Sequence, residues 1–209
     1  NTGYNPFTAE GKKTAAFEIW ETVIEKKDFD RPLSVFVSVG DGNIISGLHK
    51  GFKDLSEIGM LERMPRIFGC QSTGSAAIAN AYQKGTEEIE PVSADTLADS
   101  ISVNLPSDGL RALRAATETE GAYVAVDDQA ILQAVADLGR VGIFAEPAGA
   151  TSYAGLKKAL EDGLVQPRDP VLVLNTGSGL KDVDAAMEAA GEAPVIKPDL
   201  DEVKKLLSS

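Results

Sequence analysis

Two glycine-containing turns carry polar groups that could bind an anion. The first, Gly40–Asn43, follows the apolar run Leu33–Val39 and precedes a segment of helical spacing. Glycine lets the backbone approach a phosphate closely, and the amides at a helix start point at the anion. The GK[ST] ending of a Walker loop is absent, and Ile45 stands where a dinucleotide fingerprint needs glycine. Because short strand-to-helix turns commonly contain glycine, the pattern alone leaves a phosphate site and a plain turn open.

The second turn, Asn175–Gly179, presents hydroxyl groups on Thr176 and Ser178 after the apolar run Pro170–Leu174. In open α/β sheets, ligands bind outside the carboxyl ends of the strands. Glu146 follows a further short apolar segment, so the two turns and this carboxylate would surround one crevice. Thr176 could equally cap its own loop, and Glu146 could face the dipole of the helix that it precedes.

Strand-like runs alternate with helical spacing along the chain. Several of these runs are uniformly apolar, which is typical of strands buried on both faces. The pattern therefore predicts an α/β fold with a doubly wound, mostly parallel sheet. The expected strands are 33–39, 66–71, 122–126, 141–145 and 170–174, and the expected helices are 10–25, 44–58, a segment through Tyr82, a segment capped by Asp127 or Asp128 and ending at Leu138, 147–161 and 182–190. Residues 85–108 are rich in Glu, Ser and Asp and are expected to be irregular.

The chain divides into one domain and a tail. Residues 1–191 are expected to form the α/β domain, and residues 192–209 a linker followed by a short amphipathic helix at 199–207. The first residues, Asn1–Pro6, lack an initiator Met and read like the middle of a loop. We therefore expect a fragment of a longer protein.

Composition excludes several classes of function. Twenty basic and thirty-two acidic side chains leave a net charge of −12, which repels nucleic acid and anionic lipid, so we expect neither as a partner. Cys70 and His49 are the only residues of their types, so an internal disulfide cannot form and no metal site is expected. No apolar run approaches the roughly 18 residues that span a membrane, and no signal peptide is visible, which predicts a cytoplasmic protein.

Five blocks, in order and in register, resemble the second half of threonine synthases. These are pyridoxal-phosphate enzymes of fold type II, the tryptophan-synthase-β-like fold. The resemblance covers nearly all of residues 1–190. Its blocks are NPFTAEGKKTAAFEIWE, VFVSVGDGNIISGLHKGFKDL, PRIFGCQSTGSAAIANAY, GIFAEPAGATSYAGLKKAL and VLVLNTGSGLKD.

The resemblance implies pyridoxal 5'-phosphate as cofactor and a homodimer as the assembly. It implies conversion of an amino-acid phosphate, O-phospho-L-homoserine, with water to L-threonine and phosphate. The residues implied to hold the cofactor phosphate are Gly40, Asp41, Gly42 and Asn43. Thr176 is implied to give a hydroxyl to the pyridine nitrogen, and a neutral partner there suits elimination and replacement at the β and γ carbons. Glu146 and Asn5 are further candidate site residues.

The sequence departs from this family in two ways. The lysine that forms the Schiff base, normally in the N-terminal half, has no counterpart, so no catalytic residue is expected in this chain and we expect it to be inactive alone. Lys53 lies about 15 Å along a helix from Asn43 and shares a polar face with His49, and Lys181 belongs to the second turn. The segment after Asn5 also lacks the basic residue that meets a substrate phosphate in some members, so the missing half or Lys12/Lys13 would supply that charge, or the substrate differs.

Two other readings stay open. Within the same fold, the parent protein could be a threonine or serine dehydratase or another β-replacement enzyme. In a different class, the chain could be a non-catalytic doubly wound domain that binds a phosphorylated metabolite or a partner.

Overall fold

The computed structural model describes residues 5–192 and 194–207. Residues 1–4 of the loop-like start expected at Asn1–Pro6 lie outside the described residues, as do 193, 208 and 209 of the expected tail. The central sheet has four parallel strands in the order β3-β2-β1-β4. Their bounds are Ser34–Ser38 (β1), Arg66–Ser72 (β2), Ala122–Val126 (β3) and Val171–Leu174 (β4).

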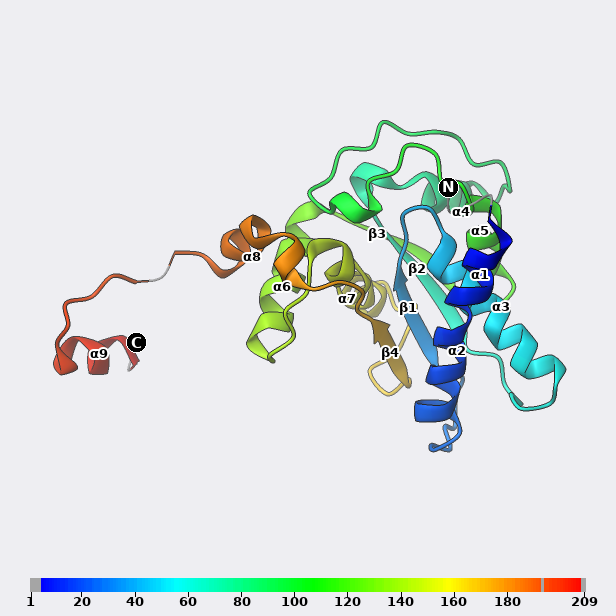
Figure 1. Ribbon diagram of the computed structural model, residues 1–209, viewed down its shortest axis with the longest axis horizontal. Coiled ribbons are helices and arrows are strands. Elements are labelled where there is room, and N and C mark those ends of the chain that lie inside the picture. The colour runs from blue at the N-terminus through cyan, green and yellow to red at the C-terminus, as the bar shows by residue number, and fades with distance from the viewer. Residues whose placement is uncertain (1–4, 193, 208–209) are drawn as a thin grey trace.

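Helices cover both faces of this sheet, which confirms the doubly wound, parallel architecture (Figure 1). One face carries α1 (Pro6–Lys12), α2 (Thr14–Ile19), α3 (Asn43–Glu57), α4 (Ala77–Lys84) and α5 (Gly109–Thr117). The other face carries α6 (Asp128–Arg140) and α7 (Pro147–Glu161). Two separate apolar cores result, and on the α7 face Phe36 and Phe68 stack with their ring centroids 4.6 Å apart.

Most of the expected helices are present, although the first one is divided. Helix α1 has Asn5 as its cap and Pro6 at its first position. Helix α2 comes next, and a π-helical turn at Trp20–Ile24 follows it. Asp127 caps α6 through an oxygen that accepts from the backbone N–H of Ala130, 2.7 Å away. Proline also opens α7, as expected.

The strand expected at 141–145 is wrong. Helix α6 continues to Arg140, and Gly142 adopts a left-handed conformation with φ of +83°, so only three residues remain before Glu146. This segment instead makes a single antiparallel bridge between Ala145 and Ser178. A run of three residues with an exposed Phe144 has neither the length nor the burial of a parallel strand.

Residues 85–108 are mostly irregular, as expected, with one short 3-10 turn at Asp99–Ile101. Beyond the last strand, a 3-10 turn at Gly179–Lys181 leads into α8 (Val183–Ala190). Helix α9 (Leu200–Leu207) lies at the end of an extended segment, away from the sheet, and none of its residues is buried (Figure 1). None of the helices in the described ranges is long and apolar enough to cross a membrane.

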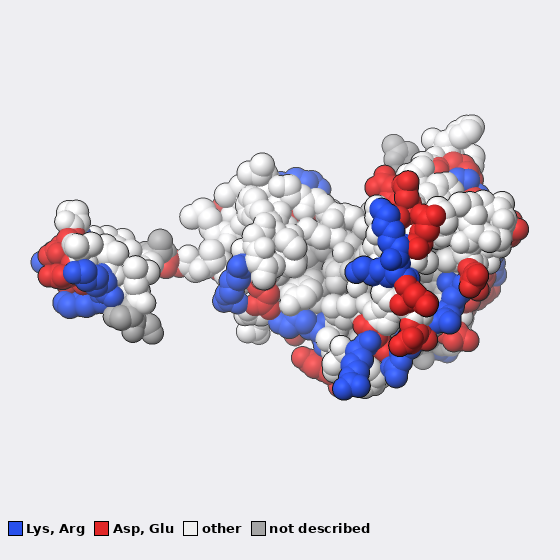
Figure 2. Space-filling model, turned by 90° about the horizontal axis from the view of Figure 1, so that it is seen from below, with Lys and Arg blue, Asp and Glu red and all other residues white. Residues whose placement is uncertain are grey.

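Charges of both signs are interspersed on the surface seen in Figure 2. Arg31 and Asp169 form an ion pair at 2.6 Å between two loops that precede strands. Because all four strands are parallel, their carboxyl ends meet at one edge of the sheet, and the two polar glycine turns follow β1 and β4 there.

Candidate functional site

A cleft of about 330 Å³ opens at the carboxyl ends of β1 and β4. It brings together the first glycine turn, Thr176 and Glu146, as the sequence predicts. The other polar residues that line it are Lys12, Ser38, Ser100 and Lys181. The site is therefore formed by five regions distant in the chain: α1, the β1–α3 turn, the loop near Ser100, the start of α7 and the turn after β4.

The first glycine turn has little room for side chains. Gly42 precedes α3 with φ of +93°, and a Cβ added there would lie 2.7 Å from Cβ of Ala112 and 2.9 Å from the carbonyl oxygen of Asp108. A Cβ on Gly40 would lie 2.9 Å from Cα of Ile101. The glycines are thus required by close contact with the loop and α5, whether or not an anion binds.

Asn43 gives the independent sign of a ligand. Its side chain is 6% exposed, and both its amide nitrogen and its amide oxygen are buried without a hydrogen-bond partner among the described residues. Buried polar groups are nearly always paired, so such an amide calls for an explanation. Asn43 is the first residue of α3, where the leading backbone N–H groups have no intrahelical acceptor and no side chain caps them. Together these donors fit a phosphate group.

Asp41 uses its side chain elsewhere. Its Oδ1 accepts hydrogen bonds from the backbone N–H of Ser107 at 3.0 Å and from the Ser107 hydroxyl at 2.9 Å. Its carbonyl oxygen accepts from the N–H of Asp108 at 2.9 Å. The carboxylate therefore anchors the neighbouring loop, and only the backbone N–H of Asp41 is available to an anion.

The second glycine turn is attached to the segment that precedes α7. The backbone N–H of Glu146 donates to the carbonyl oxygen of Gly177 at 3.3 Å, and that of Gly179 donates to Phe144 at 3.0 Å. Gly149 in the first turn of α7 allows this approach, since a Cβ there would lie 2.7 Å from the carbonyl oxygen of Thr176. Thr176 is partly buried and lines the cleft.

Glu146 is buried at the cleft wall, with 6% of the residue exposed. Its carboxylate pairs with the ammonium of Lys181 at 2.8 Å and accepts from the hydroxyl of Ser100 at 3.5 Å. Although Glu146 precedes α7, its side chain does not cap that helix. At the start of α7 the carboxylate thus forms an ion pair that joins separate segments.

Two adjacent lysines at the end of α1, Lys12 inside the helix and Lys13 directly after it, differ in their surroundings. Lys13 donates to Asp54 of α3 at 2.8 Å and pairs with Glu10 at 2.7 Å. Lys12 instead lines the cleft and has no ion-pair partner among the described residues. Only Lys12 of this pair is placed to meet an anion in the cleft.

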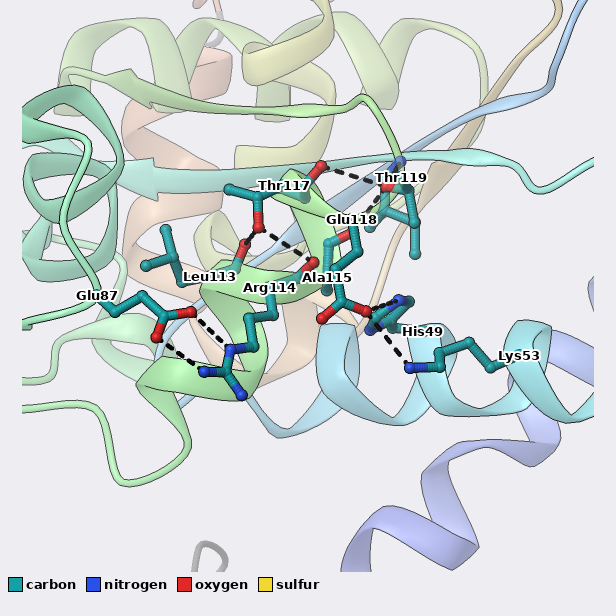
Figure 3. A network of polar contacts seen from close by, with 11 residues as sticks. His49, Lys53, Glu87, Leu113, Arg114, Ala115, Thr117, Glu118 and Thr119 are labelled. Atoms are coloured by element: carbon teal, nitrogen blue, oxygen red, sulfur yellow. Dashed lines mark hydrogen bonds and ion pairs between the residues drawn. The ribbon is translucent and has the colours of Figure 1, made fainter.

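Three residues considered from the sequence lie outside the cleft lining. Asn5 caps α1 by accepting from the backbone N–H of Phe7 at 3.0 Å. Figure 3 shows Lys53 and His49 directed at Glu118, each 3.4 Å from the same carboxylate oxygen. His49 is not on an exposed polar face as expected: it is 8% exposed, and burial lowers its pKa.

Sequence reasoning did not select Ser38 or Ser100, and it treated Lys181 only as a poor Schiff-base candidate. Ser38 is the last residue of β1, and its hydroxyl accepts from the backbone N–H of Ser152 at 2.9 Å. A polar residue at the end of an apolar strand is a sequence pattern that could have indicated Ser38. Ser100 lies in the irregular loop, where no periodicity indicates which residue reaches the cleft.

Comparison with known proteins places these features in a family. Residues 1–177 match the family described as pyridoxal-phosphate dependent enzyme. The threonine synthase of Methanocaldococcus jannaschii is 38% identical over 205 residues, covering 97% of this chain and 50% of the relative. That of Methanosarcina acetivorans is 33% identical with the same coverage. The chain thus spans about half the length of these curated relatives.

Solved structures agree on the fold. Threonine synthase from Escherichia coli has a TM-score of 0.65 at 18% identity and covers 94% of this chain and 48% of its own. A threonine deaminase from Solanum lycopersicum has a TM-score of 0.67 at 22% identity, covering 87% of this chain and 47% of its own. Both lie below the identity at which more than the fold can be compared. The resemblance and fold expected from the sequence are confirmed.

Proposed function

This chain belongs to the pyridoxal-phosphate dependent enzyme family, and we propose that it is a cofactor-binding half of a threonine synthase. The full-length protein would convert O-phospho-L-homoserine and water to L-threonine and phosphate. Support for this choice within the family comes from relatives of that name at 33–38% identity. The pyridoxal group, when bound, would supply the electron sink for proton removal and bond breaking on the substrate.

One observation carries the proposal: the unpartnered Asn43 amide and the start of α3 line the same cleft as Thr176. The donors at the helix start would bind the cofactor phosphate, with the helix dipole adding to the attraction. The Thr176 turn would then receive the other end of the cofactor. Asp41 and Gly40 would contribute backbone rather than side-chain contacts.

Thr176 would offer its hydroxyl to the ring nitrogen. A hydroxyl is neutral and can either donate or accept, so it does not hold that nitrogen in its charged form as a carboxylate would. This gives a moderate electron sink, which suits replacement chemistry. Glu146 would not take over the role, because its carboxylate is bound to Lys181.

Lys12 would bind the phosphate of the substrate. It lines the cleft in the helix that also contains Thr8, where the expected basic residue is absent. Lys13 is committed to Asp54 and Glu10. Replacing Lys12 by Met in the full-length protein should raise KM for the phosphorylated substrate about tenfold, the order expected for a lost charge-assisted hydrogen bond. Lys26→Met, on an exposed loop, is the control, and equal KM values in both variants would reject this role.

The Schiff-base lysine would come from outside these residues. Within the cleft lining, the two lysines are Lys12 and Lys181, and Lys181 is paired with Glu146. We therefore expect the 209-residue chain alone to be inactive and the full-length protein to be active.

The test of the function uses the full-length protein with two substrates. Phosphate release from O-phosphohomoserine should greatly exceed ketoacid formation from threonine or serine, and the reverse order would identify a dehydratase. Thr176→Val should lower kcat about a hundredfold because the hydroxyl is lost, while Thr176→Ser should retain most of it. A full-length protein without a cofactor absorbance band would instead be a non-catalytic binding domain.

A further inference from the structure

We propose that the ion pair between Glu146 and Lys181, here named the latch, positions the turn that carries Thr176. Glu146 and Lys181 would thereby affect the cofactor site without touching the reacting atoms. This inference rests on the proposed function for its catalytic consequence. Its structural part concerns the cofactor-free chain and can be tested separately.

The latch presses against the turn itself. The Glu146 carboxylate occupies the space where a side chain at position 177 would be, since a Cβ on Gly177 would overlap its Oε1. Gly177 has φ of +104°, a conformation that other residues rarely adopt. Position 177 therefore requires glycine for two reasons: its positive φ, and the lack of space for a Cβ beside the Glu146 carboxylate.

Lys181 closes the latch from the other side of the turn. It lies five residues after Thr176, in the 3-10 turn Gly179–Lys181, and its ammonium reaches back to both oxygens of Glu146 at 2.8 and 3.0 Å. The ammonium also lies 3.3 Å from the hydroxyl of Ser100. Three segments of the cleft wall, around residues 100, 146 and 181, thus meet at one buried carboxylate.

The buried charge of Glu146 requires the ion pair with Lys181. A carboxylate that is 8% exposed cannot keep its charge cheaply without a partner. Without Lys181, the buried carboxylate of Glu146 must draw in water or another cation, and the turn that it contacts must shift. A displacement of about 1 Å in a group that positions the reacting part can lower a rate by about a hundredfold.

An ion pair with only a structural role would stabilise the fold without affecting the cofactor. The experiment must therefore separate an effect on fold stability from an effect on the cofactor site. The full-length variants are Lys181→Met, Lys181→Arg and Glu146→Gln. The matched control is Lys157→Met, which removes a 2.8 Å pair with Asp137 between α6 and α7, away from the cleft lining. Readouts are kcat, KM, the absorbance maximum of the bound cofactor and amide hydrogen exchange of residues 175–179.

Lys181→Met should lower kcat by about tenfold to a hundredfold with a smaller change in KM, and shift the absorbance maximum. Lys181→Arg should recover most of both, and Lys157→Met should change neither. The double variant Glu146→Gln/Lys181→Met should lose no more than the worse single variant, because the two residues act as one unit.

Hydrogen exchange decides the structural part in cofactor-free protein. Exchange at residues 175–179 should be at least about tenfold faster in Lys181→Met than in Lys157→Met. If this difference appears but the wild type has no cofactor band, the latch stands and the proposed function fails. If Lys181→Met leaves exchange, spectrum and kcat unchanged while only the unfolding midpoint falls, the latch is overturned.

Discussion

At the scale of single residues, Asn43 and Gly42 separate two meanings of a glycine turn. Gly42 is explained by contacts with Ala112 and Asp108 that leave no space for a Cβ. The amide of Asn43 is explained by nothing in the described chain, because both its polar atoms are buried and unpartnered. The anion site therefore rests on the asparagine and the helix start more than on the glycines that first drew attention to it.

Substituting Gly42 should affect both folding and cofactor binding. Gly42→Ala forces a Cβ into contact with Ala112 and requires a left-handed alanine, which together should cost about 2 kcal/mol or more of unfolding free energy. Cofactor affinity should fall in parallel, because the start of α3 moves. Chemical denaturation and cofactor titration measure the two effects, with Gly139→Ala as the control, since a Cβ there has no neighbour within 4 Å. Equal stability of the two variants would contradict the packing described.

Cys70 should be inert in the native protein. Its thiol is fully buried against α7, and burial raises the pKa of Cys70 to about 12. At about pH 8 only about one thiol in ten thousand would be ionised. Mass-mapped alkylation should therefore leave Cys70 unlabelled until denaturant is added. Rapid native labelling at this position would mean that the contact between β2 and α7 opens readily.

At the scale of elements, α3 links the cleft to the first helices. Gly47 and Gly51 lie one turn apart on α3, and a Cβ on either would lie 2.6 Å from atoms of Lys12 or Lys13. The close approach sets Lys12 at the cleft and Lys13 opposite Asp54. Two glycines on one helix face thus set the positions of Lys12, the last residue of α1, and of Lys13 directly after it.

The ion pair between Lys13, which follows α1, and Asp54 of α3 should make stability depend on pH. The hydrogen bond from Lys13 lowers the pKa of Asp54 below its usual value. A lowered folded pKa means that the contribution is present above the unfolded pKa and is lost as the pH falls through the folded pKa. Asp54→Asn should therefore cost about 1 kcal/mol of unfolding free energy near neutral pH and progressively less in acid.

Urea unfolding of wild type and variant across the acidic range measures this difference. Asp30→Asn, at an exposed loop position, serves as the control and should change little. A loss in Asp54→Asn that stays constant from neutral to strongly acidic pH would contradict the assignment to the Lys13 pair.

Elements with strong local signals could be predicted, and those fixed by tertiary contacts could not. The apolar runs at β1 and β2 and the Glu146-Pro147 start of α7 are read directly from residue type and spacing. The segment 141–145 looked like a strand because three apolar residues stand together, but α6 runs into it and Gly142 turns the chain. Helix α5 carried no expectation, since it begins at Gly109 within a Ser- and Asp-rich context.

The cleft was predictable in the same measure. Its strand-end turns follow from parallel strands, whose carboxyl ends must share one edge. The position of Ser100 depends on how a long irregular loop folds back, and the pairing of Glu146 with Lys181 depends on how two separate segments approach each other. No local pattern encodes either. Burial of His49 likewise depends on α5, which the sequence did not reveal as a helix.

At the scale of the whole molecule, the chain spans about half the length of the curated relatives that it matches, and under the proposed function it would contain the residues that bind the cofactor. The residues of the cleft lining would then offer donors to a phosphate, the Thr176 hydroxyl to a ring nitrogen and the Lys12 ammonium to a second anion. The covalent anchor of the cofactor would have to approach from another part of the full-length protein. The residues that bind the cofactor and the lysine that anchors it would thus lie in different parts of the full-length protein.

The most direct test is borohydride reduction of the cofactor-loaded full-length protein, followed by peptide mapping of the modified lysine. We expect one pyridoxyl-lysine, located outside the 209 residues of this sequence. A pyridoxyl group on Lys12, Lys181 or any other lysine of this chain would contradict it.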